Sequence, residues 1–544
     1  MGLVRILGLA LVSALIQLDR VAAWEAQCAS FTLPSSVGNS ATLIAASYYP
    51  AGALVNVTSS GGAVTSNSLP AFCRVQLLVN TGTRNMTNTE VWLPDAWDGR
   101  FLAVGNGGWS GGMVYSDLAY SGLVNGHASM STDGGHTSSS LDGTWGLNNP
   151  EAIVDYAYLS VHISVVVAKE VVSAYYGATA GFKSYWLGCS TGGRQGDLHE
   201  GNRLMSVQRY PDDFDGVVVG SPANWISHLQ AWSIHFNLLV SPQNSTSWIS
   251  AATWALIHQE VLNQCDALDG VIDGLLNDPR RCFFRPETLA CRPGQDATTC
   301  LSAAQINAVR LVFSDYYETS QTYIFGRLEP GGELAYETGL LGANPVEINT
   351  DYFKDMVVND SNWDYTTLNY STIQLADQID TYRLDAVNPD IQTYVAAPHN
   401  GKVIHYVSWA DQLISPGNSL YYYEQMTAFM NLNTNLNVDD YYRLFTVPGM
   451  QHCAGGDGPN GFGGEGQSAA GMPPLQPDAL HDVLRGMIAW VEQGAAPNYF
   501  IATKYVNNTA SGGVQMTRPL CKFPTEIVYN GYGDTNNAGS FYCA

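Results

Sequence analysis

Positive charge is scarce in this sequence. Only 24 of its 544 residues are Lys or Arg, against 48 Asp and Glu, and the formal net charge is −24. No stretch gathers basic side chains into a stripe. Because binding to a phosphate backbone or an anionic membrane depends on clustered Lys and Arg, this composition argues against nucleic acid and against a charged lipid surface as partners.

Long apolar runs are also absent beyond the N-terminus. The first residues combine Arg5, an apolar run over residues 6–18 and small residues up to Ala23, which together indicate a secretory signal peptide over residues 1–23. That run is too short for a membrane anchor, and no later run reaches the roughly 20 apolar residues of a spanning helix. We therefore expect a soluble, secreted protein with no membrane partner.

Two kinds of residue fit an extracellular protein. Six sequons are acceptor sites for N-linked glycans, at Asn56, Asn85, Asn244, Asn359, Asn369 and Asn507. The ten cysteines are an even number, which in a secreted chain predicts five disulfides. Short sequence separations favour four local pairs, namely Cys28 with Cys73, Cys265 with Cys282, Cys291 with Cys300, and Cys521 with Cys543.

Two cysteines, Cys189 and Cys453, remain without a near neighbour in sequence. Cys189 stands directly before Ser190 in the stretch "GCSTGGRQG". At this point it is a candidate second nucleophile, metal ligand or disulfide partner.

Strand-like apolar runs alternate with helical segments along much of the chain. Runs such as "RFLAVGNGG" and "FDGVVVGSPA" end in Gly-rich turns, the pattern of parallel strands joined by helices, so we predict an α/β fold. After Pro222 this rhythm gives way to Trp, Tyr, Asn and Thr, and it returns at "GKVIHYVSWADQ". We predict one catalytic domain in two parts, residues 24–215 and 396–544, separated by an inserted domain at 216–395.

Ser190 is the candidate nucleophile. It occupies a G-x-S-x-G motif that follows the apolar run "YWLG" and precedes a predicted helix. Glycines on either side allow the tight strand-to-helix turn that exposes a nucleophilic hydroxyl at the carboxyl edge of a sheet. The motif alone is common, and its place between strand and helix makes the catalytic interpretation specific.

A serine hydroxyl needs a base, and in this architecture an acid and a histidine follow the serine along the chain. Asp411 comes directly after the strand-like "KVIHYVSW", and His452 directly after "YRLFTVPG". Both should therefore lie at the sheet edge that carries Ser190. We predict the triad Ser190, Asp411 and His452.

Other acids and histidines fit these roles less well. Asp439 and Asp440 precede the last strand and should lie at the opposite edge, while Asp457 lies in the Gly-rich loop 455–466. His199 falls in the helix after the serine and His405 inside a strand, where histidines more often pack or hydrogen-bond than act as bases.

An oxyanion hole requires two N–H donors aimed at the developing negative oxygen. The residue after the nucleophile, Thr191, supplies one in this architecture. The loop "AVGNGGWSGG" supplies the other, and we favour Gly108 over the adjacent Gly107. A plain glycine turn is the alternative for this loop.

The stretches "GCSTGGRQG", "SWADQLISP" and "GMQHCAGG" together resemble the tannase and feruloyl esterase family of secreted, mainly fungal α/β-hydrolases, over essentially the whole mature chain. The resemblance implies an α/β-hydrolase fold with a large lid domain inserted between nucleophile and acid. It also implies a disulfide between the cysteine before the nucleophile and the cysteine after the catalytic histidine, here Cys189 and Cys453.

One loop of the insertion is rich in aspartate. Asp266, Asp269 and Asp273 offer hard oxygen ligands, with the carbonyls of Val271 and Leu275 as further donors, although the spacing is not that of an EF-hand. Spacing alone does not separate a calcium site from Asp-Gly turns. The family resemblance, which implies a structural calcium at a matching loop of the lid, favours Ca²⁺; no organic cofactor is expected.

The predicted activity is a serine carboxylesterase reaction through an acyl-enzyme. The resemblance implies release of hydroxycinnamic acids such as ferulic acid from esterified plant polysaccharides, including xylan. Tyrosines, thirty in number, are candidates for an aryl pocket, although core packing accounts for most of them.

Two alternatives were weighed against this activity. A tannase would act on galloyl esters, but tannases tend to be cleaved at a dibasic site, and the only candidate, Arg280-Arg281, lies beside Cys282 and is expected to be poorly exposed. A glycan-binding protein on an inactive scaffold would be expected to lack a triad member, and here none is missing.

Overall fold

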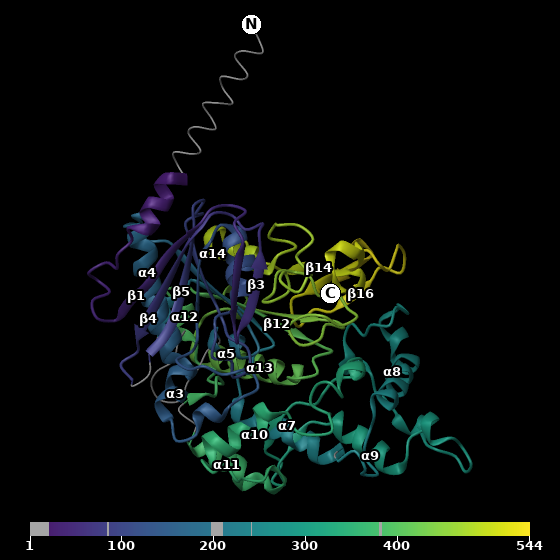
Figure 1. The fold of residues 1–544 in the computed structure, drawn as a ribbon. Coiled ribbons are helices and arrows are strands. Elements are labelled where there is room, and N and C mark those ends of the chain that lie inside the picture. Colours follow the sequence, from purple (N-terminus) through teal and green to yellow (C-terminus); the bar gives the residue numbers. More distant parts are fainter. Residues whose placement is uncertain (1–20, 84–85, 197–209, 241, 380–382) are drawn as a thin grey trace.

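The structure is a computed structural model that describes residues 21–83, 86–196, 210–240, 242–379 and 383–544. Its centre is a nine-stranded sheet (Figure 1). In spatial order its strands are β1 (Ala41–Tyr49), β4 (Phe72–Asn80), β5 (Met86–Pro94), β7 (Ala128–Thr132), β6 (Arg100–Val104), β8 (Lys183–Cys189), β9 (Gly216–Gly220), β12 (Lys402–Ser408) and β13 (Tyr442–Val447). Strands β1, β4, β5 and β7 pair antiparallel, and the pairs from β7 to β13 are parallel.

The parallel strands are apolar because both of their faces are covered. In β9, Val217 and Val219 belong to one buried core and Val218 to the other, as the two-residue period of a strand requires. Helices α4 (Ser160–Tyr176) and α13 (Pro416–Asn433) cover the first face, and α14 (Val483–Gln493) covers the second. The sheet is therefore the middle of three layers. Its carboxyl edge carries the loops after β8, β12 and β13.

Within the described residues one helical stretch, Pro150–Tyr176, has the length and composition of a membrane span. Most of its apolar window is buried, and α4 within it contributes Val165, Ala168 and Val172 to the sheet core. Burial in the sheet core therefore accounts for the length and apolar character of this helix.

Between β9 and β12 lies a mainly helical insertion, at the bottom of Figure 1. Its main elements are α7 (Ile226–Val240), α8 (Ala251–Cys265), α9 (Ala303–Val312), β10 (Tyr316–Tyr317), β11 (Tyr323–Phe325), α10 (Glu347–Asp351) and α11 (Tyr370–Ile379). These elements bury a hydrophobic core of their own. This segment packs on the carboxyl edge of the sheet and encloses the space beside Ser190.

The insertion is shorter at both ends than the expected 216–395. The expected start, residue 216, is the first residue of β9. This segment, "GVVVG", is buried on both faces as a central strand of the sheet. At the other end, Ile391, Tyr394 and Val395, around α12 (Gln392–Val395), pack into the sheet core. Residues of the insertion's own core run from Ala223 to Leu384 in this part of the chain.

The remaining strands form small antiparallel pairs beside the main sheet. They are β2 (Val55–Ser59) with β3 (Gly62–Ser66), β14 (Tyr499–Tyr505) with β15 (Val514–Cys521), and β16 (Ile527–Tyr529) with β17 (Phe541–Cys543). All five predicted disulfides are present, including the four local pairs and Cys189–Cys453. The antiparallel β1, β4 and β7 of the main sheet were not anticipated from the sequence.

Candidate active site

Ser190 occupies a strained turn between β8 and α5 (Thr191–Gly196). Its φ of 61° is in the left-handed region that non-glycine residues rarely adopt. Two hydrogen bonds of 2.9 Å stabilise the turn. The Ser190 N–H donates to the Gly220 carbonyl, and the Ser190 carbonyl accepts the N–H of Ala223. A Cβ at Gly188 would lie 2.3 Å from the carbonyl oxygen of Gly192, so this spacing requires glycine. The G-x-S-x-G motif therefore forms a strand-to-helix turn with Ser190 half-buried at its apex.

Asp411 and His452 meet at the same edge of the sheet. Asp411 follows β12 and His452 follows β13, and Nδ1 of His452 lies 2.9 Å from Oδ2 and 3.1 Å from Oδ1 of Asp411. The Asp411 side chain is fully buried, and its Oδ1 also accepts the N–H groups of Leu413 and Ile414. Because a carboxylate can only accept, the proton of this pair lies on Nδ1, which leaves Nε2 free to act as a base.

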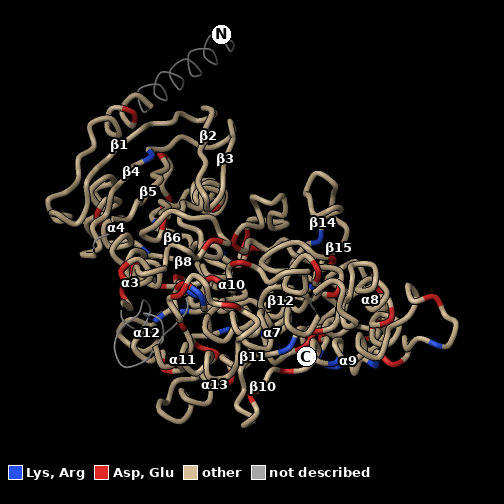
Figure 2. Tube along the Cα trace, turned by 60° about the horizontal axis from the view of Figure 1, so that its bottom comes forward, with Lys and Arg blue, Asp and Glu red and all other residues tan. Residues whose placement is uncertain are grey.

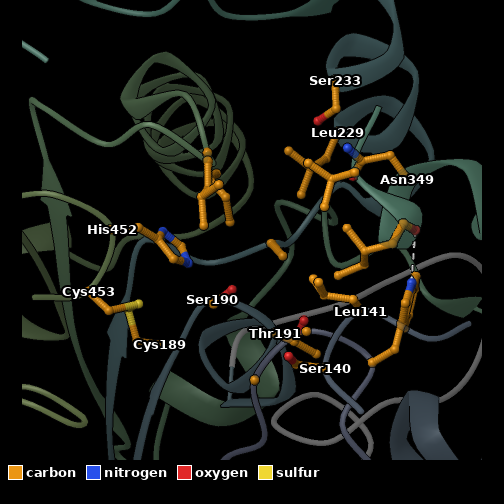
Figure 3. Close-up of a pocket in the computed structure, with 18 of the residues that line it drawn as sticks. Ser140, Leu141, Cys189, Ser190, Thr191, Leu229, Ser233, Asn349, His452 and Cys453 are labelled. Atoms are coloured by element: carbon orange, nitrogen blue, oxygen red, sulfur yellow. Dashed lines mark hydrogen bonds between the residues drawn. A yellow bond between two sulfur atoms is a disulfide. The ribbon is translucent and has the colours of Figure 1, made fainter. Parts of the chain in front are cut away.

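Figure 3 shows the His452 ring directed toward Ser190 across the mouth of a cavity. Both residues line that cavity. The structure thus brings together the three residues predicted as the triad, from loops after three different strands of the parallel sheet.

The competing residues have other partners. Asp439 lies before β13 and forms an ion pair with Lys522 at 2.6 Å. His405 is buried in β12 between the hydroxyls of Tyr442 and Ser419, and burial lowers its pKa to about 3. His199 lies outside the described residues.

Cys189 is a disulfide partner. Its bond to Cys453 joins the residue before Ser190 to the residue after His452. A carboxylate oxygen of Glu465 and the two sulfurs lie within 4.8 Å of one another, but disulfide sulfurs offer no thiolate to a metal. The second-nucleophile and metal-ligand interpretations of Cys189 are therefore excluded.

Glu465 is a site residue that sequence reasoning missed. Its Oε2 accepts the Cys189 N–H at 2.7 Å, and the residue lines the cavity. Burial and the neighbouring carboxylate of Asp117 raise the pKa of Glu465 well above 4.5. Asp117 is buried too, and its Oδ1 accepts the Gly466 N–H at 3.1 Å. Glu465 is one of two acids, with Asp457, in the Gly-rich loop after His452, and that loop was the available clue.

The candidate oxyanion donors border the same cavity. Gly107, Gly108 and Thr191 line it together with Ser190. Gly108 has a φ of 55°, and a Cβ there would lie 2.3 Å from the Ser140 carbonyl oxygen, so only glycine fits. Among the described residues, no hydrogen bond takes the N–H of Gly107 or Gly108. Either group is thus available to a substrate oxygen.

The cavity has a volume of about 400 Å³ and is mainly apolar. Its walls include Leu141, Leu229, Leu340, Val346, Ile348, Leu413 and Ile414. Among the described residues that line it, none is a tyrosine and Trp109 is the one tryptophan, with its Nε1 donating to the Ile348 carbonyl at 2.9 Å. The tyrosines considered for an aryl pocket therefore lie elsewhere, and aliphatic side chains form most of its walls.

The aspartate-rich loop carries three carboxylates, but their oxygens do not all lie within 4.8 Å of one another in the described structure. Burial raises the pKa values of Asp266 and Asp269, and the charge of Asp273 raises both further. Oxygen donors in mutual repulsion suit a hard cation such as Ca²⁺. Asp273 also pairs with the buried Arg518 at 2.6 Å, and Asp266 accepts the N–H groups of Asp273 and Gly274. The donor chemistry fits calcium, although part of it is used by these protein contacts.

Comparison with known proteins gives the family. The model of the family described as "Tannase and feruloyl esterase" matches residues 73–544. A protein of Neosartorya fischeri named probable feruloyl esterase B-2 is 37% identical over 542 residues, covering 98% of each chain.

Solved structures agree with this comparison. The crystal structure of feruloyl esterase B from Aspergillus oryzae superposes with a TM-score of 0.86 at 34% identity, covering 96% of this chain and 100% of that chain. Tannin acyl hydrolase from Aspergillus niger has the same fold, with a TM-score of 0.72 at 22% identity over 97% of this chain and 94% of that chain. The expected α/β-hydrolase fold is confirmed.

Proposed function

We propose, since this chain belongs to the tannase and feruloyl esterase family and is a carboxylic ester hydrolase, that it is a secreted enzyme that releases ferulic and related hydroxycinnamic acids from plant cell-wall polysaccharides. The observation that carries the proposal is the His452–Asp411 hydrogen bond at the mouth of an apolar cavity shared with Ser190. An apolar cavity with few polar groups suits a conjugated aryl acid.

The catalytic cycle follows from the geometry. Nε2 of His452 takes the proton of Ser190 Oγ as that oxygen attacks the ester carbonyl. The N–H groups of Thr191 and Gly108 stabilise the resulting oxyanion. Collapse of the tetrahedral intermediate breaks the ester C–O bond, and His452 gives the proton to the leaving sugar oxygen, which departs as a hydroxyl. Water, activated by His452, then cleaves the acyl-enzyme and releases the free acid.

Asp411 keeps the imidazole oriented during this cycle and stabilises its positive charge. The buried carboxylate is itself held by two backbone N–H groups, those of Leu413 and Ile414. Orientation of the base is therefore built into the loop after β12.

Replacing triad members tests the mechanism. We expect Ser190→Ala to lose at least about a hundredfold in kcat on methyl ferulate, and Asp411→Asn about 10³-fold or more, with the fold retained by circular dichroism. Asp457→Asn is the matched control, because Asp457 is the rival acid in the loop after His452, and it should keep activity. Near-full activity of Asp411→Asn with loss in Asp457→Asn would assign the acid to Asp457.

Galloyl ester hydrolysis is the second candidate activity. Arg280 is partly buried, paired with Asp278 and stacked over Trp409, as expected, but Arg281 is exposed, contrary to expectation. The dibasic pair is therefore a weaker argument against a tannase than its sequence context indicated. Parallel assays of the purified protein on methyl ferulate, methyl caffeate and methyl gallate separate the two, and a preference for gallate would overturn the feruloyl assignment.

Secretion and glycosylation are part of the same proposal. Five disulfides suit an oxidising compartment. The five sequons within the described residues all have exposed asparagines, namely Asn56, Asn244, Asn359, Asn369 and Asn507. Asn85 and most of the predicted signal peptide lie outside the described residues.

A structural Ca²⁺ in the insertion completes the proposal. Asp266, Asp269 and Asp273 would hold it, with the carbonyls of Val271 and Leu275. These residues do not line the cavity beside Ser190. The ion would neutralise their charges and stabilise the loop, with no part in ester cleavage.

A further inference from the structure

One face of helix α7 forms a wall of the active-site cavity. Ile226, Leu229, Gln230 and Ser233 all line it, at positions i, i+3, i+4 and i+7, which share one side of an α-helix. The start of α7 is tied to the nucleophile, because the N–H of Ala223 donates to the Ser190 carbonyl at 2.9 Å. Later residues on this face of α7 therefore lie farther from Ser190, deeper in the cavity where the acyl group of a substrate would bind.

The far part of this face carries two unpaired polar atoms. Gln230 and Ser233 are each 2% exposed, and neither Gln230 Oε1 nor Ser233 Oγ has a hydrogen-bond partner among the described residues. Buried polar atoms without a partner are unfavourable and uncommon in native proteins. Elsewhere on the same helix, Ser227 bonds to Asp385, and His228 bonds to the Ile324 carbonyl.

The surroundings of these two atoms are mostly apolar, with Asn349 as a further polar residue at the same end of the cavity. Leu229, Leu340, Val346 and Ile348 line the same cavity. Figure 3 shows Leu229, Ser233 and Asn349 at the end of the cavity away from Ser190 and His452. A ligand that satisfies this end must be apolar along its length and carry a hydrogen-bonding group at its tip.

We propose that Gln230 and Ser233 bind the ring hydroxyl of the acyl group, so that the enzyme selects 4-hydroxylated cinnamoyl esters over cinnamoyl esters without that hydroxyl. A phenol O–H would donate to Gln230 Oε1, and its oxygen would accept the Ser233 O–H. This inference rests on the proposed hydrolysis of hydroxycinnamoyl esters and identifies the residues that choose among them.

Helix geometry favours a cinnamoyl over a galloyl group at this position. Ile226 and Ser233 are seven residues apart, which corresponds to about 10 Å along the helix axis. In a galloyl ester the ring is attached directly to the carbonyl carbon, whereas a cinnamoyl ester places a vinyl spacer between them. Gln230 and Ser233, beyond the start of α7 that contacts Ser190, therefore suit the ring hydroxyl of the longer acid.

Paired substrates and conservative variants test the proposal. Wild-type protein should hydrolyse methyl p-coumarate with at least about tenfold higher kcat/KM than methyl cinnamate. Gln230→Leu and Ser233→Ala should each lower kcat/KM for methyl p-coumarate several-fold and leave the value for methyl cinnamate unchanged or higher. Thr503→Val is the matched control, because Thr503 also has a buried, unpaired hydroxyl but lies outside the cavity.

Three results would overturn the assignment of Gln230 and Ser233 to the ring hydroxyl. Equal loss on both esters in the Gln230 and Ser233 variants, or no loss on either, overturns the proposal. So does a wild-type enzyme that does not distinguish the two esters. Failure of the proposed function looks different: the wild-type protein would cleave p-nitrophenyl acetate or methyl gallate but neither cinnamoyl ester.

Discussion

At the scale of single residues, the site depends on side chains placed where their ordinary chemistry is altered. Ser190 has a backbone conformation that only surrounding contacts can maintain. Glu465 is held against the disulfide beside it, with a carboxyl whose pKa is raised by burial and by Asp117. Neither residue type alone signals its role, because the role comes from the immediate surroundings.

Glu465 makes stability depend on pH. Because its folded-state pKa lies above its ordinary value of 4.5, the folded protein keeps a proton that the unfolded chain loses between these two values. The stabilisation that protonated Glu465 gives the folded state is fully present below pH 4.5, and it is lost as the pH rises through the folded-state pKa. Glu465→Gln cannot ionise, and its amide oxygen can still accept the Cys189 N–H. We expect its melting temperature, relative to wild type, to rise progressively as pH increases above about 4.5.

Thermal melts of both proteins from pH 4 to pH 8 measure this difference. Glu347→Gln is the control, since Glu347 is exposed in the insertion, and its difference from wild type should stay flat. A Glu465→Gln difference that is constant across this range, or that falls, would contradict the assignment of a protonated Glu465.

At the scale of elements, the Cys189–Cys453 disulfide joins the end of β8 to the loop after β13. It closes a segment of 264 residues that includes the whole insertion. The chain-entropy estimate for such a closure is about 5.6 kcal/mol, an upper bound, against about 2.6 kcal/mol for the 9-residue separation of Cys291 and Cys300. Its position also holds the nucleophile and the base in register, where small displacements are costly in rate.

The double variant Cys189→Ala with Cys453→Ala should therefore lose activity beyond its loss of folded protein. We expect kcat per folded molecule to fall at least about tenfold, because the loops carrying Ser190 and His452 are no longer joined. Cys291→Ala with Cys300→Ala, a disulfide of the insertion away from the cavity, should lower stability modestly and leave kcat unchanged. Equal kcat per folded molecule in both double variants would show that the Cys189–Cys453 bond acts on stability alone.

At the scale of the whole molecule, the sheet and the insertion meet across the cavity. Loops at the carboxyl edge of the sheet carry Ser190, Asp411 and His452, and the insertion supplies α7 and the residues around Ile348. Among the residues that Figure 2 colours by charge, acidic ones are spread over the molecule and basic ones are few, with no continuous basic stripe. That distribution agrees with an uncharged ester substrate more than with a polyanion.

Removal of calcium should destabilise the molecule without direct loss of chemistry. A ligand that binds only the folded state at about 100 times its Kd adds about 2.7 kcal/mol. We expect EGTA to lower the melting temperature by several degrees, while kcat at 25 °C stays unchanged. Asp269→Asn should abolish the EGTA effect, and Asp296→Asn, at an exposed acid elsewhere in the insertion, should preserve it. An unchanged melting curve, with no metal by elemental analysis, would refute the calcium site.

The fold class, the turn at Ser190 and the positions of the candidate acid and base could all be predicted from the residue pattern. Ser190 could be located because strand, turn and helix residues are contiguous there, and Asp411 and His452 because each directly follows an apolar strand. Parallel strands present their carboxyl ends at one edge, so order along the chain was enough to bring these loops together. Four disulfides were predictable because short loops bring their cysteines close.

The residues that complete the site depend on contacts between segments far apart in the sequence. Glu465 reaches Cys189 across 276 residues of sequence, and Arg518 reaches Asp273 across 245. The α7 pattern at Ile226, Leu229, Gln230 and Ser233 is visible in the sequence, but which helix face meets the cavity depends on how the insertion packs on the sheet. Periodicity and motif spacing report local geometry. These contacts depend instead on the relative placement of distant segments, which the packing of the insertion on the sheet determines.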